Sequence, residues 1–135
     1  MVKNLRNIIL MVVFCAMAAS ATLFADEFTK KDLEKWNKEF MTVVKKGEAL
    51  FHSGLGTNTV SCDMCHPNAT NTHPETYPKF QKQLGKVVAL RDMINWCIQN
   101  PLEGEPLALD DPKMIALEAY ITYERAGKPL APGKH

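Results

Sequence analysis

The chain has 135 residues, with 16 basic and 15 acidic side chains and a formal net charge of +1. Charges of both signs are interspersed along it, which argues against a nucleic-acid-binding protein, because such proteins usually carry a basic patch. The sequence contains no internal repeat and no low-complexity segment.

The first 25 residues have the pattern of a secretory signal peptide: two basic residues, then an apolar run from residue 8 to about residue 24. We expect cleavage after Ala25, leaving residues 26–135 as one domain with 14 basic and 15 acidic side chains. The run is just short of the roughly 20 residues that a spanning helix needs, so a retained membrane anchor is the alternative. Contact with a membrane is expected only in that case.

Three segments have the apolar spacing of helices that bury one face. They are residues 30–52, residues 87–99 and the segment from Pro112 to Gly127. Thr29 and Asp32 resemble a capping box at the start of the first helix, and Pro101 stops the second. Nothing indicates a strand. The sequence therefore predicts an all-α domain of three or more helices, with long loops at residues 67–78 and 102–110.

Cys62-Asp63-Met64-Cys65-His66 has the C-x-x-C-H spacing of haem attachment. Residues three apart share one face of a helical turn, so both thiols can form thioethers with one porphyrin edge. The next residue, His66, then projects its imidazole beneath the iron. We expect one covalently bound haem c, attached through Cys62 and Cys65, with His66 as proximal iron ligand.

Three other interpretations of the motif are weaker. Zinc needs four ligands, and after Cys62, Cys65 and His66 only Cys97 is available. A thioredoxin-like redox pair needs a βαβ context, which the sequence lacks. A disulfide between Cys62 and Cys65 leaves His66 unexplained.

The second ring N–H of His66 needs an acceptor that fixes the orientation of the ring. We expect a backbone carbonyl from the loop at residues 67–78, with Pro78 as the first choice. Pro78 would otherwise only shape that loop.

The ligand on the other side of the iron decides what the haem can do. The candidates are Cys97, Met93, Met114, His73 and His52. Cys97 is the thiol left over once two cysteines hold the haem, and Met93 lies one turn before it on the same helical face. Core packing explains Met114 better, and we expect His73 to be solvated and His52 to lie at the surface or near a haem edge. The chemistry alone leaves Cys97 and a methionine open.

Two segments resemble the paired terminal helices of class I cytochromes c. They are Gly47-Glu-Ala-Leu-Phe51 and Ala116-Leu-Glu-Ala-Tyr-Ile121. The resemblance implies a class I cytochrome c-like fold around one haem, in which these helices cross in close contact. It would explain Gly47 and place Phe51 against Leu117 and Tyr120.

The middle of the chain resembles the SoxA and thiosulfate dehydrogenase cytochromes. The similar stretches are Tyr77-Pro-Lys-Phe80, Leu90-Arg-Asp-Met-Ile-Asn-Trp-Cys97, Pro101-Leu-Glu-Gly104 and Pro112-Lys-Met114. The resemblance implies that Cys97 ligates the iron opposite His66, at a haem that is a site of thiosulfate chemistry. Thiosulfate dehydrogenases typically carry two haems and basic residues near this cysteine. Here there is one C-x-x-C-H, and Arg91 is the only arginine nearby.

We therefore expect a periplasmic monohaem cytochrome that transfers electrons, as a soluble carrier or as the haem subunit of a redox complex. Redox partner proteins would dock at an exposed haem edge near residues 62–64. The alternative is a sulfur-compound, thiosulfate-type oxidoreductase that uses the iron and Cys97, since a thiolate is the reactive form of cysteine. A ligand or redox sensor is less expected, because no signalling domain is attached.

Overall fold

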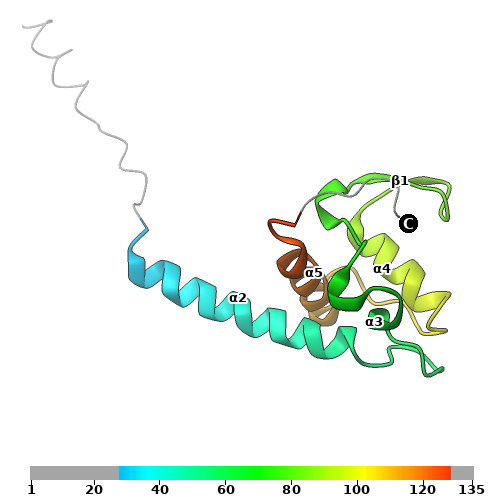
Figure 1. The fold of residues 1–135 in the computed structure, drawn as a ribbon, viewed down its shortest axis with the longest axis horizontal. Coiled ribbons are helices and arrows are strands. Elements are labelled where there is room, and N and C mark those ends of the chain that lie inside the picture. The colour runs from blue at the N-terminus through cyan, green and yellow to red at the C-terminus, as the bar shows by residue number, and fades with distance from the viewer. Residues whose placement is uncertain (1–27, 129–135) are drawn as a thin grey trace, which may run out of the picture. The chain divides into compact units, whose positions relative to one another are not determined.

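The computed structural model describes residues 28–128, so the expected signal peptide at residues 1–25 and the last residues, 129–135, lie outside the described part. The contacts divide the chain into residues 1–33 and residues 34–135. The elements in chain order (Figure 1) are α2 Lys30–Phe51, α3 Cys62–Cys65, η1 Pro67–Ala69, η2 Pro74–Thr76, β1 Lys79–Gln81, β2 Lys86–Val88, α4 Leu90–Gln99 and α5 Pro112–Arg125. Within residues 28–128, no helix has the length and apolar character that crossing a membrane requires.

Helix ends follow the signals in the sequence. Thr29 and Asp32 form the predicted capping box: the Thr29 hydroxyl accepts from the Asp32 N–H at 3.2 Å, and the Asp32 carboxylate accepts from the Thr29 N–H at 3.1 Å. At the start of α5, the Asp111 carboxylate accepts from the Lys113 N–H at 2.7 Å. Gly127 follows the end of α5 with a φ of 70°, as expected for a residue that ends a helix.

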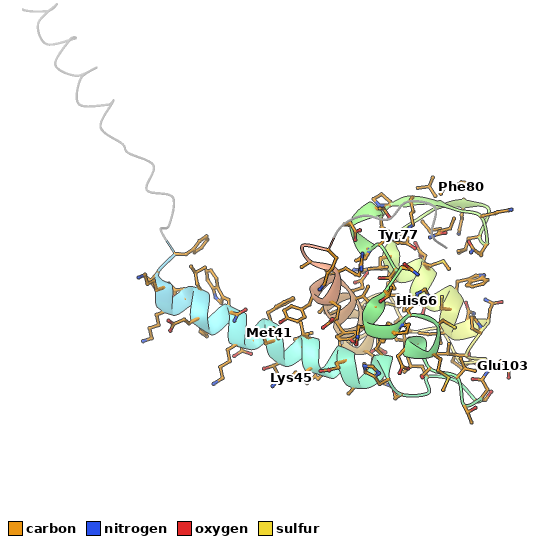
Figure 2. All side chains as sticks on the ribbon, viewed as in Figure 1. Met41, Lys45, His66, Tyr77, Phe80 and Glu103 are labelled. Carbon is orange, nitrogen blue, oxygen red and sulfur yellow. The ribbon has the colours of Figure 1, made fainter. Side chains whose placement is uncertain are left out.

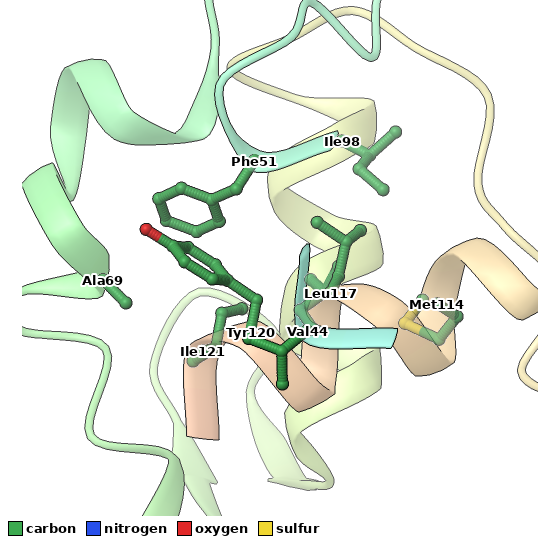
Figure 3. Close-up of a cluster of buried hydrophobic side chains, with 9 residues drawn as sticks. Val44, Phe51, Ala69, Ile98, Met114, Leu117, Tyr120 and Ile121 are labelled. Carbon is green, nitrogen blue, oxygen red and sulfur yellow. The ribbon is translucent and has the colours of Figure 1, made fainter. Parts of the chain in front are cut away.

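Helices α2 and α5 cross at Gly47, as the resemblance to class I cytochromes c implied. A Cβ atom at Gly47 would lie 1.9 Å from the Ala116 carbonyl oxygen, so only glycine allows this approach. One turn further along α2, the Phe51 ring lies 5.1 Å from the Tyr120 ring, centroid to centroid (Figure 3). Leu117 is fully buried beside them. This crossing fixes where α2 ends and the motif segment begins.

The core joins α2, α4 and α5 to the segment after the motif (Figure 3). Its buried members are Val44, Phe51, Ala69, Ile94, Ile98, Met114, Leu117, Tyr120 and Ile121. Elements that are far apart in the sequence thus contribute side chains to one core, and the loop after the motif packs against the helices through Ala69. The loop after α2 is also held by hydrogen bonds: the Asn58 amide donates to the Pro101 carbonyl at 2.9 Å, and the Thr57 hydroxyl donates to the Glu103 carbonyl at 3.1 Å.

The expectation that no strand is present was wrong. β1 and β2 form an antiparallel hairpin in which Phe80 faces Val87, and Lys79 faces Val88. The turn between them includes Gly85 at a φ of 67°. Because β2 occupies residues 86–88, α4 begins at Leu90 and not at residue 87. Strands of three residues are too short to show a two-residue period, which is why the sequence gave no signal for them. The domain is otherwise helical, as predicted.

Candidate functional site

The two motif thiols lie on one helical turn, as predicted from their spacing. That turn is α3, with Cys62 half-buried at its start and Cys65 exposed at its end. Cys62, Cys65 and Cys97 are all free thiols. The α3 turn therefore presents two sulfur atoms available for covalent attachment.

One ring nitrogen of His66 is held by the backbone of the loop that follows it. Its Nδ1 lies 2.9 Å from the Thr70 carbonyl oxygen; His66 is labelled in Figure 2. A carbonyl only accepts, so Nδ1 carries the hydrogen and the lone pair of Nε2 is left available. The acceptor is a backbone carbonyl of the loop, as predicted, but the choice of Pro78 was wrong. Asn68 and Ala69 adopt φ values of 49° and 54°, and this left-handed backbone turns Thr70 back beneath the ring.

The structure brings Cys97 of α4 to the motif. Burial raises the pKa of Cys62 to about 11, and the next largest contribution comes from the Cys97 thiol. Burial likewise raises the pKa of Cys97 to about 11, with a further contribution from Cys65. Electrostatic effects of this kind show that Cys97 lies within range of the motif thiols across a partly buried site. We refer to the motif turn and Cys97 together as the candidate haem site.

Tyr77 and Gln81 also belong to this region, and the sequence did not identify them as site residues. Burial raises the pKa of Tyr77, and Cys97 raises it further. The Gln81 amide donates to the Tyr77 hydroxyl at 2.5 Å. Tyr77 lies in one of the stretches similar to the SoxA and thiosulfate dehydrogenase cytochromes, which was the one available signal.

The methionine candidates have different environments. Met114 is fully buried in the core cluster on α5, as core packing predicted. Met93 lies half-buried on α4, one turn before Cys97. Met93 therefore stays the methionine alternative to Cys97.

The two histidine candidates for the second ligand, His52 and His73, also differ in their environments. His52 is exposed, as expected, and its Nδ1 lies 2.9 Å from the Asp63 carboxylate. The expectation that His73 is solvated was wrong, because only 4% of its surface is exposed. Its backbone has a φ of 48°, and its Nδ1 lies 3.4 Å from the Glu75 carboxylate. The polar neighbours of His73 in the sequence gave no sign that the loop folds it inward.

Asp63 links the motif to the end of α2. Its carboxylate accepts a short hydrogen bond from the Ser61 hydroxyl and pairs with His52. The hydrogen bond from Ser61 is the main reason that the pKa of Asp63 is lowered, and the bond with His52 is the second. The two contacts hold the first turn of α3 in place beside α2.

Arg91 has a structural role. Its guanidinium donates to both oxygens of Glu118 on α5, at 3.1 and 2.8 Å, and to the Leu109 carbonyl at 3.1 Å. This two-pronged ion pair fastens α4 to α5. Arg91, the arginine near Cys97 in the sequence, is therefore already engaged by protein partners.

These donors fit haem c better than a bare metal ion. Two free thiols on one turn, next to an imidazole with Nε2 available, are the groups that a covalently bound haem requires. Within residues 28–128, no group of three or more His, Cys, Asp or Glu residues is arranged to hold a metal ion by itself. The zinc interpretation therefore gains no support from the described residues.

A C-x-x-C-H turn beside closely crossing helices, in a mostly helical domain, defines a class I c-type cytochrome. The chain belongs to the SoxA/TsdA cytochrome c domain family, whose family model matches residues 46–130. Membership implies haem c as the cofactor and haem-based electron transfer as the chemistry.

The chain is similar to several longer proteins. It is 28% identical to a thiosulfate dehydrogenase of Psychrobacter arcticus over 81 residues, covering 54% of this chain and 25% of the relative. It is also 28% identical to a thiosulfate dehydrogenase of Allochromatium vinosum over 85 residues, covering 54% and 32%. The L-cysteine S-thiosulfotransferase subunit SoxA of Pseudaminobacter salicylatoxidans is 24% identical over 115 residues, covering 82% and 40%. The match thus spans a quarter to two fifths of the length of these relatives.

Proposed function

We propose that this chain is an exported, periplasmic monohaem cytochrome that transfers electrons, as a soluble carrier or as the haem subunit of a redox complex. In this proposal residues 1–25 are a signal peptide that is removed, and residues 26–135 form the cytochrome domain. Cys62 and Cys65 would attach the haem, and His66 and Cys97 would bind its iron. When bound, the haem supplies a one-electron couple at its iron.

The observation that carries the proposal is the geometry around His66. The Thr70 carbonyl accepts from Nδ1 at 2.9 Å, which selects the tautomer with a free Nε2 and limits rotation of the ring. The ring is therefore oriented by the backbone of the loop. An imidazole held in this way is suited to bind a metal on the side of the motif thiols.

The grouping of Cys97 with the motif supports a thiolate ligand. Burial raises the pKa of Cys97 to about 11, so the thiol is neutral at pH 7 in the chain alone. Coordination to a cation is what deprotonates a buried thiol. Thiolate ligation is expected to lower the reduction potential relative to histidine–methionine ligation.

The exposed end of α3 supports partner docking at the motif. Met64 is 65% exposed, and Cys65 next to it is also exposed. A partner that docks over these residues reaches the edge to which the cofactor is attached. Docking surfaces of electron-transfer proteins are typically small and short-lived, which suits a single exposed turn.

Spectroscopy of the full chain, produced in a host that attaches haem c, tests the ligand set. We expect one haem per chain that resists acid-acetone extraction, and a low-spin thiolate EPR signature that Cys97→Ala abolishes. Met93→Leu and Met114→Leu are the matched controls and should leave the signature unchanged. A far-red methionine-to-iron charge-transfer band that disappears in Met93→Leu would assign Met93 in place of Cys97. A colourless protein would contradict the whole proposal.

A sulfur-compound oxidoreductase is the second candidate, favoured by the similarity to thiosulfate dehydrogenases. It would require an anion-binding group near Cys97, and Arg91 is engaged by Glu118. Turnover of thiosulfate by the purified chain, with ferricyanide as electron acceptor, distinguishes the two functions. Sustained turnover that Cys97→Ala abolishes would establish the enzyme. The carrier proposal predicts that the purified chain turns over thiosulfate no faster than free haem does.

A further inference from the structure

We propose that the outer face of the β1–β2 hairpin docks a partner protein that has an acidic rim around an apolar centre. The hairpin face is the exposed pair Phe80 and Val87 together with the adjoining turn end of the hairpin, where Lys82 and Lys86 are exposed. Lys86 pairs with Gln81, so its side chain starts from the opposite side of the strand. The inference rests on the proposed function, because the partner would be an electron donor or acceptor of the cytochrome. It adds a second contact surface to the exposed end of α3.

The strand register places the two apolar side chains together. Phe80 and Val87 face each other across the hairpin, so they lie on the same side of it, while Val88 and Lys79 lie on the other side. Val88 is buried, whereas Phe80 and Val87 are 63% and 65% exposed. Single exposed apolar residues are ordinary, but a cross-strand aromatic–aliphatic pair that faces away from the core forms a continuous apolar surface.

The charge of the hairpin indicates what the partner carries. Residues 79–91 contain Lys79, Lys82, Lys86 and Arg91 and no acidic residue, and Arg91 is neutralised by Glu118. Lys82 and Lys86 are exposed and take part in none of the ion pairs found among residues 28–128. Lys79 lies on the other side of the hairpin, with its ammonium nitrogen 4.6 Å from the centre of the Tyr77 ring, so the positive charge at the turn comes from Lys82 and Lys86. Such a rim attracts and orients an acidic protein surface.

The hairpin is also connected to the candidate cofactor site. Its inner side carries Gln81, which donates to the Tyr77 hydroxyl, and Tyr77 interacts with Cys97. In Figure 2, Phe80 stands on the outer side of the hairpin, whereas Tyr77 lies on the side towards His66. A partner on the hairpin face would therefore dock on the opposite side of the hairpin from Tyr77.

A second copy of this chain is a less suitable occupant. The hairpin segment contains no acidic residue, so a second copy would have to bind it through a different surface. Pairing of this kind is head-to-tail and continues into open chains unless the rotation closes a ring. An anionic lipid surface would attract the lysines. It would not offer a surface complementary in shape to the apolar pair, as a partner protein can.

The test uses flavodoxin, an acidic one-electron protein, as the probe at low ionic strength. Association with the full-length cytochrome is followed by surface plasmon resonance, and carbodiimide coupling of lysines to carboxylates is mapped by mass spectrometry. We expect cross-links at Lys82 and Lys86. The double variant Lys82→Glu/Lys86→Glu should slow association by about tenfold or more and remove most of its salt dependence. Phe80→Ser should instead mainly speed dissociation.

The matched control is Lys45→Glu/Lys46→Glu, which changes two exposed α2 lysines and shifts the net charge by the same amount. It should leave association within about twofold of the unchanged chain, whereas equal effects of both double variants would overturn the proposal. Cross-links at other lysines only would also overturn it. Two further results would overturn the proposal. One is self-association of the cytochrome that the hairpin variant abolishes. The other is binding to phosphatidylglycerol vesicles, without binding to flavodoxin, that the hairpin variant abolishes. The haem spectrum of each sample is recorded separately, so loss of haem is distinguished from loss of docking.

Discussion

Asp63 lies inside the haem-attachment motif but contacts the protein on either side of it. Its carboxylate accepts from Ser61 and pairs with His52 at the end of α2. Two such partners favour the charged form of the carboxyl, which is why its pKa lies below the ordinary value of 3.8. This one side chain thus makes the position of the attachment turn dependent on pH.

We predict that Asp63→Asn lowers stability at neutral pH and removes part of its acid dependence. A folded-state pKa below the unfolded value contributes stability above about pH 4, and this is lost as the pH falls through the folded pKa. The free energy of unfolding in urea, measured from pH 7 down to pH 2, should therefore fall less steeply for the variant. Asp110→Asn, at an exposed loop position, is the control and should match the unchanged chain. If the free energy of unfolding fell equally steeply towards pH 2 in all three proteins, the role of Asp63 would be refuted.

At the scale of residues, the sequence predicted those positions whose chemistry is set by spacing. Cys62 and Cys65 share a turn, and the capping residues act where expected. Prediction from the sequence failed where the backbone takes conformations that the residue types do not indicate. Non-glycine residues with positive φ are uncommon, so the turn that brings Thr70 rather than Pro78 to His66 had no readable signal. The same backbone places His73 inside.

The crossing of α2 and α5 requires a residue without a side chain at position 47, where the sequence has Gly47. We predict that Gly47→Ala destabilises the domain by about 2 kcal/mol or more, because the new methyl group would meet the Ala116 carbonyl at 1.9 Å. The gain of about 1 kcal/mol in helix propensity does not offset a clash with backbone. Thermal unfolding of the haem-loaded protein measures the loss.

Gly54→Ala is the control for that substitution. A Cβ atom at Gly54 would be 3.6 Å from its nearest neighbour, the Asn58 carbonyl oxygen, which is an ordinary contact distance. Its melting temperature should stay close to that of the unchanged chain. Equal melting temperatures for both glycine variants would show that the helices can separate without cost.

At the scale of elements, the three long helices were predictable because their apolar residues recur at helical spacing, and α2 and α5 also have clear capping signals. The hairpin was not, since three residues per strand cannot establish a period and its outer face is apolar where solvent would favour polar side chains. Because β2 occupies residues 86–88, α4 begins three residues later than predicted. The unpredicted element is also the one with an unusual surface.

For the whole molecule, the core is small and the loops are long. We predict that Cys62→Ser/Cys65→Ser, which removes both points of attachment, gives a protein with a lower melting temperature and weaker near-ultraviolet circular dichroism. Each 1 kcal/mol of lost stability lowers the melting temperature by roughly 4–8 °C in a domain of this size. Cys97→Ser changes a cysteine but keeps both attachment points, so it should unfold closer to the unchanged chain. Equal melting curves for all three proteins would mean that the haem adds nothing to stability.

The tightly wound segment after His66 limits which amino acids natural variants of this chain can use. Asn68, Asn71 and His73 all have left-handed backbone, with φ between 48° and 63°. Asparagine, aspartate, histidine and glycine tolerate that conformation, whereas valine and isoleucine do not. Substitution during evolution should therefore be narrow at these three sites even though two of them face solvent, because a single branched side chain there would pull the Thr70 carbonyl away from the imidazole.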